Sequence, residues 1–301
     1  MNISKQAVFQ ARKRQLNFDN EFMELVSQVD IIRDDHPGCG VEKMYKTLAP
    51  KHIGRDKFCE IFMSLGYRVR TIKDYRRTTI PTHLNYPNLI QGMMVTRPHQ
   101  VLQSDITYFD INNSFYYLVF IIDVYTREIM GYHVSKNMRK ESNIKALKMA
   151  LKQISPSDAK RMIHHSDRGS QYGSKAYVSM LTNTGVKVSM GLIAQDNAFA
   201  ERINGIIKNE YLKLWYINNF KTLQAKTKKA VGHYNAKRLH SSLKDITPIK
   251  FKRNLLNLNT QKRPKVIIYA DGNYKVKVAL SHQDFNPKKE PQAHNCPIEL
   301  C

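Results

Sequence analysis

The chain has 301 residues, of which 42% are hydrophobic and 24% charged, so it can bury a core and, at about 150 residues per domain, is expected to form two domains. Its 48 Lys and Arg residues outnumber its 25 Asp and Glu residues, which leaves a formal charge of +23. Such an excess disfavours a compact state unless a polyanion binds, so nucleic acid is the first expected partner. No apolar run approaches the ~20 residues of a membrane-spanning helix, and the N-terminus lacks the apolar stretch of a secretory signal, so we expect a cytoplasmic protein with no membrane partner.

None of the four cysteines belongs to a CxxC pair, so neither a disulfide framework nor a zinc finger is indicated. Reduced cysteines are the expected state in a cytoplasmic protein. A zinc cluster of His36, Cys39 and Cys59 with another histidine stays open as an alternative, although the spacing fits no finger pattern.

The first 80 residues are expected to form a basic arm followed by helices. Residues 1–20 are polar and basic and are interpreted as the arm. Residues 21–78 carry apolar side chains at helical spacing, with breaks at 37–38 and near Gly54. Two short helices joined by a turn suit a helix-turn-helix, and basic residues in and after the second helix favour DNA binding, namely Arg55, Lys57, Arg68 and Arg70. An ordinary small helical bundle is the alternative.

Residues 79–98 contain three prolines and are interpreted as a linker, after which the pattern becomes α/β. Strands are expected at 101–109, 115–124, 127–134, 160–167 and 186–190, and helices at 142–154 and 174–185. The chain then has a helical pattern from 198 to about 254. Residues 99–254 are therefore expected to form one α/β domain with a mixed sheet, and 255–301 a basic extension with a hairpin around Asp271-Gly272.

Three carboxylates are the candidates for chemistry. Asp105 lies within an apolar strand, Asp167 closes another strand just before Gly169, and Glu201 lies on a helix that begins near residue 196. Oxygens from two strands and a helix can gather into the hard-ligand site that Mg²⁺ prefers, and two such ions ~4 Å apart suit an in-line displacement at phosphorus. Spacing alone favours a plainer interpretation, in which each carboxylate caps a helix or pairs with a cation.

Glu201, Asn204 and Lys208 are spaced at i, i+3 and i+7, so they are expected to share one helix face. Lys208 could then hold a phosphate beside the metal ions. This lysine has an ordinary alternative as a solvated surface charge on an amphipathic helix.

Other polar residues near these positions have structural interpretations. His164 and His165 precede the second carboxylate, and they either orient the site or pack in the core. Asp123 follows an apolar strand and is interpreted as a turn former. Asp196 and Asn197 precede a helix, and capping explains at least one of them.

The segments SDITYF, HSDRGSQY and DNAFAERINGIIKNEYL resemble, in this order, the three catalytic blocks of the OrfB-type transposases of insertion-sequence family three. Smaller pieces, HPGCG, YPNLI and YNAKRLHSSL followed by TP, extend the resemblance to residues 20–254. That family is related to retroviral integrases and carries a DDE triad. The resemblance implies a ribonuclease-H-like core with a mixed five-stranded sheet, a catalytic triad of Asp105, Asp167 and Glu201, and contact of Lys208 with the transposon end.

The resemblance also implies a reaction and its partners. Water attacks a phosphodiester at the end of the element, and the 3′-hydroxyl released then attacks another phosphodiester, with two Mg²⁺ or Mn²⁺ ions and no nucleotide cofactor. The expected partners are double-stranded DNA, as terminal inverted repeats and as target, and further copies of the chain on that DNA. An upstream-frame partner or fusion with a helix-turn-helix and a leucine zipper is also implied, since no heptad run of that kind appears here.

Two other functions stay open at this stage. One is a DNA-binding protein without catalysis, such as a decayed copy, against which the intact carboxylates argue. The other is a structure-specific nuclease of the same fold, which would cleave DNA without joining strands. Inverted repeats and an overlapping upstream frame in the flanking DNA would favour the transposase.

Overall fold

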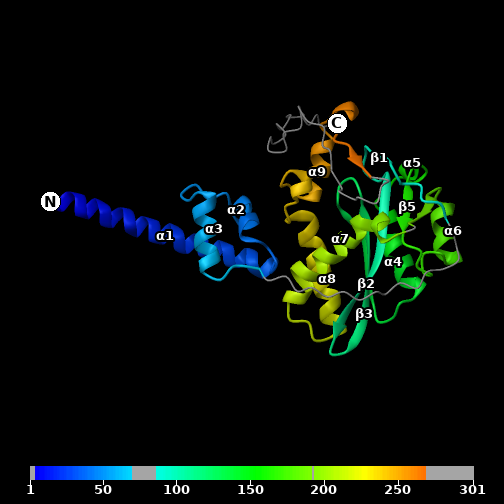
Figure 1. The fold of residues 1–301 in the computed structure, drawn as a ribbon, viewed down its shortest axis with the longest axis horizontal. Helices are drawn as coiled ribbons and strands as arrows, with labels where there is room; N and C mark the ends of the chain where they lie inside the picture. Colours follow the sequence, from blue (N-terminus) through cyan, green and yellow to red (C-terminus); the bar gives the residue numbers. More distant parts are fainter. Residues whose placement is uncertain (1–3, 70–85, 192, 269–301) are drawn as a thin grey trace, which may run out of the picture. The chain divides into compact units, whose positions relative to one another are not determined.

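The computed structural model describes residues 4–69, 86–191 and 193–268, and the chain divides into two compact units (Figure 1). The helical unit comprises Met1–Lys73 and Asn209–Trp215, and the α/β unit comprises Asp74–Lys208 and Tyr216–Cys301. Within the described ranges, no helix is both long and apolar enough to cross a membrane.

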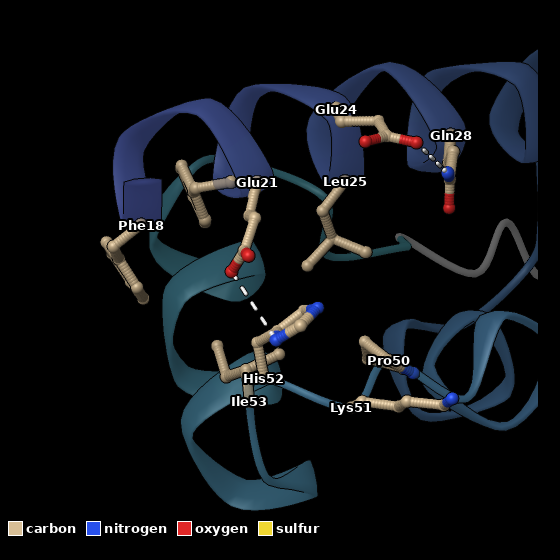
Figure 2. Close-up of a pocket in the computed structure, with 10 residues that line it drawn as sticks. Phe18, Glu21, Glu24, Leu25, Gln28, Pro50, Lys51, His52 and Ile53 are labelled. Carbon is tan, nitrogen blue, oxygen red and sulfur yellow. Dashed lines mark hydrogen bonds and ion pairs between the residues drawn. The ribbon is translucent and has the colours of Figure 1, made fainter. Parts of the chain in front are cut away.

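The helical unit contains three helices, α1 (Lys5–Asp35), α2 (Val41–Leu48) and α3 (Arg55–Ser64). The C-terminal half of α1 packs on α2 and α3 around a core that includes Val29, Met44, Phe58 and Phe62. At the end of α2, Ala49 adopts a left-handed φ of 45°, which turns the chain into the loop before α3. Figure 2 shows this loop beside α1, where Nδ1 of His52 lies 3.4 Å from the Glu21 carboxylate.

A distant segment, Asn209–Trp215, completes the helical unit. Nε2 of His36 lies 2.8 Å from Oε2 of Glu210, and the His36 ring stacks on Tyr211 at a centroid distance of 4.4 Å. The N–H of Gly38 donates to the Glu210 carbonyl at 2.8 Å, an approach that only a glycine permits, because a Cβ there would lie 2.4 Å from Cα of Glu210. The expected helical region at 21–78 is therefore not self-contained.

The N-terminal segment differs from the expected arm, because α1 already begins at Lys5. The Ser4 hydroxyl accepts a hydrogen bond from the N–H of Ala7 at 3.2 Å and so caps this helix. Every described residue from 4 to 20 is exposed. An apolar stripe forms only where a helix face is buried, so this exposed part of α1 carries no periodic signal that a sequence could reveal.

The α/β unit is built on a five-stranded mixed sheet of order β4-β3-β2-β5-β6. Its strands are β2 (Val101–Ile111), β3 (Ser114–Asp123), β4 (Ile129–Ser135), β5 (Ile163–Ser166) and β6 (Lys187–Met190). The first three pair antiparallel, whereas β5 and β6 continue the sheet in parallel from β2. This sheet confirms the expected ribonuclease-H-like α/β fold.

Helices cover both faces of the sheet (Figure 1). Leu102 of β2 belongs to a core shared with α4 and α6, and because strand side chains alternate, Gln103 and Asp105 face the opposite side, where α7 packs on β2 and β3. The helices of this unit are α4 (Lys140–Leu151), α5 (Pro156–Ala159), α6 (Lys175–Asn183), α7 (Ala198–Ile206), α8 (Phe220–Ala236) and α9 (Pro248–Leu255).

The segments on either side of this core also differ from expectation. Within the expected linker at 79–98, β1 (Met94–Val95) pairs with β7 (Val266–Ile267), and the N–H of Leu89 donates to the Ser189 hydroxyl at 2.9 Å. The described end of the linker and residues 266–267 of the extension are therefore part of the α/β unit. The expected turn at Asp271-Gly272 lies outside the described residues.

Candidate active site

The first two candidate carboxylates lie on neighbouring parallel strands. Ser104 pairs with Ser166 in the register of β2 and β5, so Asp105 and Asp167 each follow a paired position at the same level of the sheet. The Asp167 carboxylate accepts a hydrogen bond from the N–H of Gly169 at 3.0 Å. A Cβ on that glycine would lie only 3.0 Å from the same oxygen, so the absence of a side chain leaves room for this turn.

The third carboxylate is brought to β2 by a buried glutamine. Oε1 of Gln103 accepts hydrogen bonds from the N–H groups of Phe199 and Ala200, at 3.1 and 3.3 Å, and its Nε2 donates to the carbonyl of Asp196 at 3.1 Å. The first turn of a helix has no partners of its own for these amides. Gln103 therefore caps α7 from the neighbouring strand and holds the helix turn that carries Glu201.

The expected caps of α7 have other partners. Asn197 occupies the N-cap position without a side-chain capping bond, and its amide instead donates to the Ser104 carbonyl at 2.9 Å. The Asp196 carboxylate accepts from the N–H of Ile193 at 3.2 Å, in the short helix before α7. Capping thus explains Asp196 but not Asn197, which ties α7 to β2.

The helix face expected from the i, i+3 and i+7 spacing lies against β2. The Asn204 amide donates to Oδ2 of Asp105 at 2.7 Å, while Oδ1 of Asp105 accepts from its neighbouring backbone N–H at 2.9 Å. One turn later, Nζ of Lys208 donates to the Thr107 hydroxyl at 3.3 Å and lies 4.6 Å from the ring centroid of Tyr108. Lys208 falls in a π-helical turn, Ile207–Tyr211, a rare geometry that is frequent at functional sites.

The three carboxylates influence one another electrostatically. Burial raises the pKa of Asp105 well above its usual range, and the charges of Asp167 and then Glu201 raise it further, against the hydrogen bond from Asn204, which lowers it. The pKa of Glu201 is also raised, first by desolvation and then by Asp167. The residue Glu201 is nevertheless exposed, and the two aspartates are half-buried. The fold thus holds like charges together, an arrangement that a cation stabilises.

These carboxylates are neighbours rather than a closed ligand cage. Over the part of the chain that the structure describes, no three His, Cys, Asp or Glu side chains are grouped tightly enough to hold a metal ion, and this includes the zinc alternative at Cys39 and Cys59. The donors at Asp105, Asp167 and Glu201 are all carboxylate oxygens, and they fit the hard ligands that Mg²⁺ selects.

The two histidines before Asp167 are buried and do not belong to the carboxylate group. Nε2 of His164 bonds to the Tyr177 hydroxyl at 3.0 Å, and Nδ1 of His165 bonds to the Ser189 hydroxyl at 2.8 Å. Burial is the main reason that their pKa values fall, to about 3 for His164 and about 4 for His165, so both are neutral at pH 7. Of the two interpretations left open, core packing describes them.

Asp123 is the turn former that the sequence predicts. Its two carboxylate oxygens accept from the N–H of Tyr125 at 3.1 Å and from the Thr126 hydroxyl at 2.8 Å. The residue is fully buried at the end of β3, on the strand next to the one that carries Asp105.

The expected DNA-contact residues lie in the helical unit. Arg55 bonds to Asp56 at 2.9 Å, and Lys57 bonds to Glu60 at 3.2 Å, both pairs on the exposed surface of α3. Arg68 is exposed after α3, and Arg70 lies outside the described residues.

Sequence reasoning missed Gln103 as the residue that positions α7. The available signal is the strand period of two, which places position 103 on the same face as Asp105. A buried amide on that face must find partners, and the nearest unpaired backbone groups are at a helix start. Only the folded topology reveals that this helix is α7, which lies 93–97 residues further along the chain.

A mixed sheet with carboxylates on two adjacent strands and on a helix docked across them defines an integrase-type polynucleotidyl transferase core. Two family models, each of an integrase core domain, match this chain, one over residues 95–194 and the other over residues 186–248. Insertion-sequence relatives are 30–36% identical over 71–78% of this chain, and the chain belongs to the insertion-sequence transposases of family three. It is therefore an enzyme of DNA transposition and integration, which cleaves DNA strands and joins them to new sites.

Two of the similar proteins are proteins of insertion elements. The Insertion element IS600 31 kDa protein of Shigella sonnei is 36% identical over 71% of this chain and 80% of its own length. The transposase for insertion sequence element IS629 of the same species is 31% identical over 73% of this chain and 75% of its own length. Among solved structures, the HTLV-2 integrase catalytic core domain in complex with magnesium is 20% identical, covers 52% of this chain and 96% of that chain, and has a TM-score of 0.41.

Proposed function

We propose that Asp105, Asp167 and Glu201 are the catalytic triad of this transposase. The observation that carries the proposal is the convergence of these carboxylates from β2, the end of β5 and α7, where burial and then the charge of Asp167 raise the pKa of both Asp105 and Glu201. Their positions in SDITYF, HSDRGSQY and DNAFAERINGIIKNEYL support the same assignment.

The three carboxylates would hold Mg²⁺ or Mn²⁺, as two ions. Such ions supply charge for the attacking and leaving oxygens of a phosphodiester and lower the pKa of water. The chain's own side chains orient the ligands: Asn204 fixes one oxygen of Asp105 by its amide, and Gln103 fixes the turn before Glu201.

Lys208 is proposed as the phosphate contact beside the carboxylates. Its ammonium lies over the Tyr108 ring and bonds to Thr107, two positions beyond Asp105 on β2, so it is held at the same edge as the carboxylates. A lysine in this position can neutralise a phosphate oxygen of the DNA strand that is being cut.

The proposed DNA substrates are the terminal inverted repeats of the element and a target duplex. We assign repeat recognition to α2 and α3 with Arg55, Lys57, Arg68 and Arg70, as a helix-turn-helix that reads the major groove. We also propose that the chain acts on DNA as a homo-oligomer, with an upstream-frame partner or as a fusion with it. Its proposed location is the cytoplasm, at the nucleoid.

The test compares triad variants with a matched carboxylate on the same strand. Asp105→Asn, Asp167→Asn and Glu201→Gln should each reduce Mg²⁺-dependent cleavage of element ends by more than about a hundredfold, because loss of a residue that only orients a metal ligand already costs about 10–100-fold. Binding of the same DNA should persist. Asp110→Asn, an exposed change at the far end of β2, should leave cleavage unchanged.

Joining should be measured separately with pre-cleaved ends. A chain that cuts but never joins strands would be a nuclease of the same fold, and near-normal cleavage by any triad variant would remove that residue from the site.

A further inference from the structure

A pocket lies in the α/β unit, between α7, α8 and the turns that follow β3 and α8. Its volume is about 510 Å³. The polar side chains that line it include Arg127, Arg202, Ser241 and Ser242, and none of the described residues that line it is acidic. Apolar side chains of α7, among them Phe199, form another part of its wall. The pocket is therefore both cationic and apolar.

Arg127 is the unusual member of this lining because its charge is buried. The residue is only 6% exposed, and among the described residues no Asp or Glu oxygen lies within ion-pair distance of it. Its guanidinium donates to the Val124 carbonyl and lies 4.2 Å from the ring centroid of Phe199. Burial lowers the pKa of Arg127 to about 10, which is still high enough to keep it charged at pH 7.

The nearby Tyr234 and Asp123 raise the pKa of Arg127, but burial lowers it by more. The carboxylate of Asp123 is occupied by the N–H of Tyr125 and the hydroxyl of Thr126. The backbone of Arg127 also has a φ of +63°, a left-handed conformation that is unfavourable for residues other than glycine. A buried cation on a strained backbone is destabilising by itself, and such strain is concentrated at functional sites.

The remaining polar groups suit a tetrahedral anion. Arg202 is exposed on α7, next to Glu201 in sequence, and no ion pair involves it in the described part of the chain. Two guanidinium groups can each donate two parallel N–H bonds to phosphate oxygens, and serine hydroxyls can donate further bonds. The apolar wall suits the sugar of a nucleotide better than it suits water, and the volume exceeds what a free phosphate fills.

We propose that this pocket binds one backbone phosphate of the DNA, with Arg127 and Arg202 as its cations, at a position separate from the carboxylate site. The inference takes DNA as the ligand from the proposed function, but it requires neither the metal ions nor the triad. Its binding assay can therefore be run in EDTA, so a failure here would leave the triad assignment standing.

The test uses the full chain and the salt dependence of its affinity for duplex DNA. Arg202→Gln should lower the slope of log affinity against log salt by about one unit. At about 0.1 M salt this corresponds to a roughly eightfold weaker affinity, because each phosphate contact scales the binding constant as salt to the power of about −0.9. Arg139→Gln, an equal charge change at the exposed start of α4 on the other sheet face, should leave slope and affinity unchanged.

A second variant and a second probe complete the test. Arg127→Gln should weaken DNA binding in the same way without lowering the melting temperature of the free chain, because it removes a buried charge that forms no ion pair with the described residues. Inorganic phosphate should raise the melting temperature of the wild type only slightly, and by less than duplex DNA raises it. Equal slopes for Arg202→Gln and Arg139→Gln would overturn the proposal. Inorganic phosphate could instead stabilise the wild type strongly, with this stabilisation lost in Arg202→Gln while the affinity for DNA stays normal. That result would show a site for a small anion and would also overturn the proposal.

Discussion

Replacement of Gln103 by leucine should separate the positioning of Glu201 from the chemistry of the triad. Gln103 is fully buried and forms two hydrogen bonds to the start of α7 and one to Asp196 just before it. Leucine has a similar size but neither accepts nor donates. The N–H groups of Phe199 and Ala200 would then be buried without partners, two positions and one position before Glu201.

The expected loss of stability follows from these bonds. Each unsatisfied buried N–H is unfavourable by about 1–3 kcal/mol, and the apolar area added by leucine offsets part of this, so we expect a net loss of about 2–4 kcal/mol. For a unit of this size, 1 kcal/mol corresponds to about 2–4 °C, so the melting temperature should fall by roughly 4–16 °C. Cleavage should fall further than stability explains, because the turn that carries Glu201 is no longer held.

The assay combines thermal unfolding with Mg²⁺-dependent cleavage of element ends at a temperature where both proteins are folded. Gln100→Leu is the matched control, because Gln100 also bonds to backbone groups, accepting from Thr96 at 2.8 Å and donating to Met94 at 3.4 Å, but has no contact with α7. It should lose stability and keep cleavage. Normal cleavage by folded Gln103→Leu would refute the argument that this glutamine positions Glu201.

Three other perturbations test other parts of the structure. Lys208→Ala should weaken cleavage at element ends and lower the salt slope of DNA binding by about one unit, and equal behaviour of Lys213→Ala would identify an ordinary surface charge. The pKa of His164 is lowered from 6.5 to about 3 in the folded state, so its contribution to stability is complete above pH 6.5 and is lost as pH falls. Between pH 7.5 and 5.0, urea unfolding of His164→Gln should therefore show about 2 kcal/mol less loss of stability than the wild type, while the similar contribution of His165 is kept, and an unchanged pH dependence in that variant would contradict the shift. Gly38→Ala should destabilise the helical unit by about 1–3 kcal/mol in calorimetry, since its Cβ would meet the backbone of Glu210, and a wild-type melting profile would count against that packing.

The sequence predicted the α/β core because its strands and helices bury one face each. Burial imposes a period of two on strands and 3.6 on helices, and residues 101–190 follow these periods closely. The mixed sheet and its five strands were confirmed. The family was recognised from the segments around Asp105, Asp167 and Glu201, whereas spacing alone favoured structural roles for them.

The parts that were missed depend on contacts between distant residues or on the lack of any burial. Glu210 joins the helical unit through His36, 174 positions away, and no local pattern marks such a pair. The N-terminal half of α1 is fully exposed, so it has no amphipathic stripe. The segment from residue 86 was interpreted as a linker from its prolines, although Ile90 and Val95 are buried in the α/β unit.

The attachment of α7 to β2 also has a consequence for synthesis of the chain. A ribosome completes residues in order, so β2 and β5, which carry the first two carboxylates, emerge long before Glu201. The helix cap at Gln103 cannot form until residues 199 and 200 have left the exit tunnel. A product that stops before residue 198 would contain α1, α2, α3 and all five strands of the sheet but only two of the three carboxylates. Incomplete synthesis therefore yields a chain that lacks Glu201, the third candidate carboxylate.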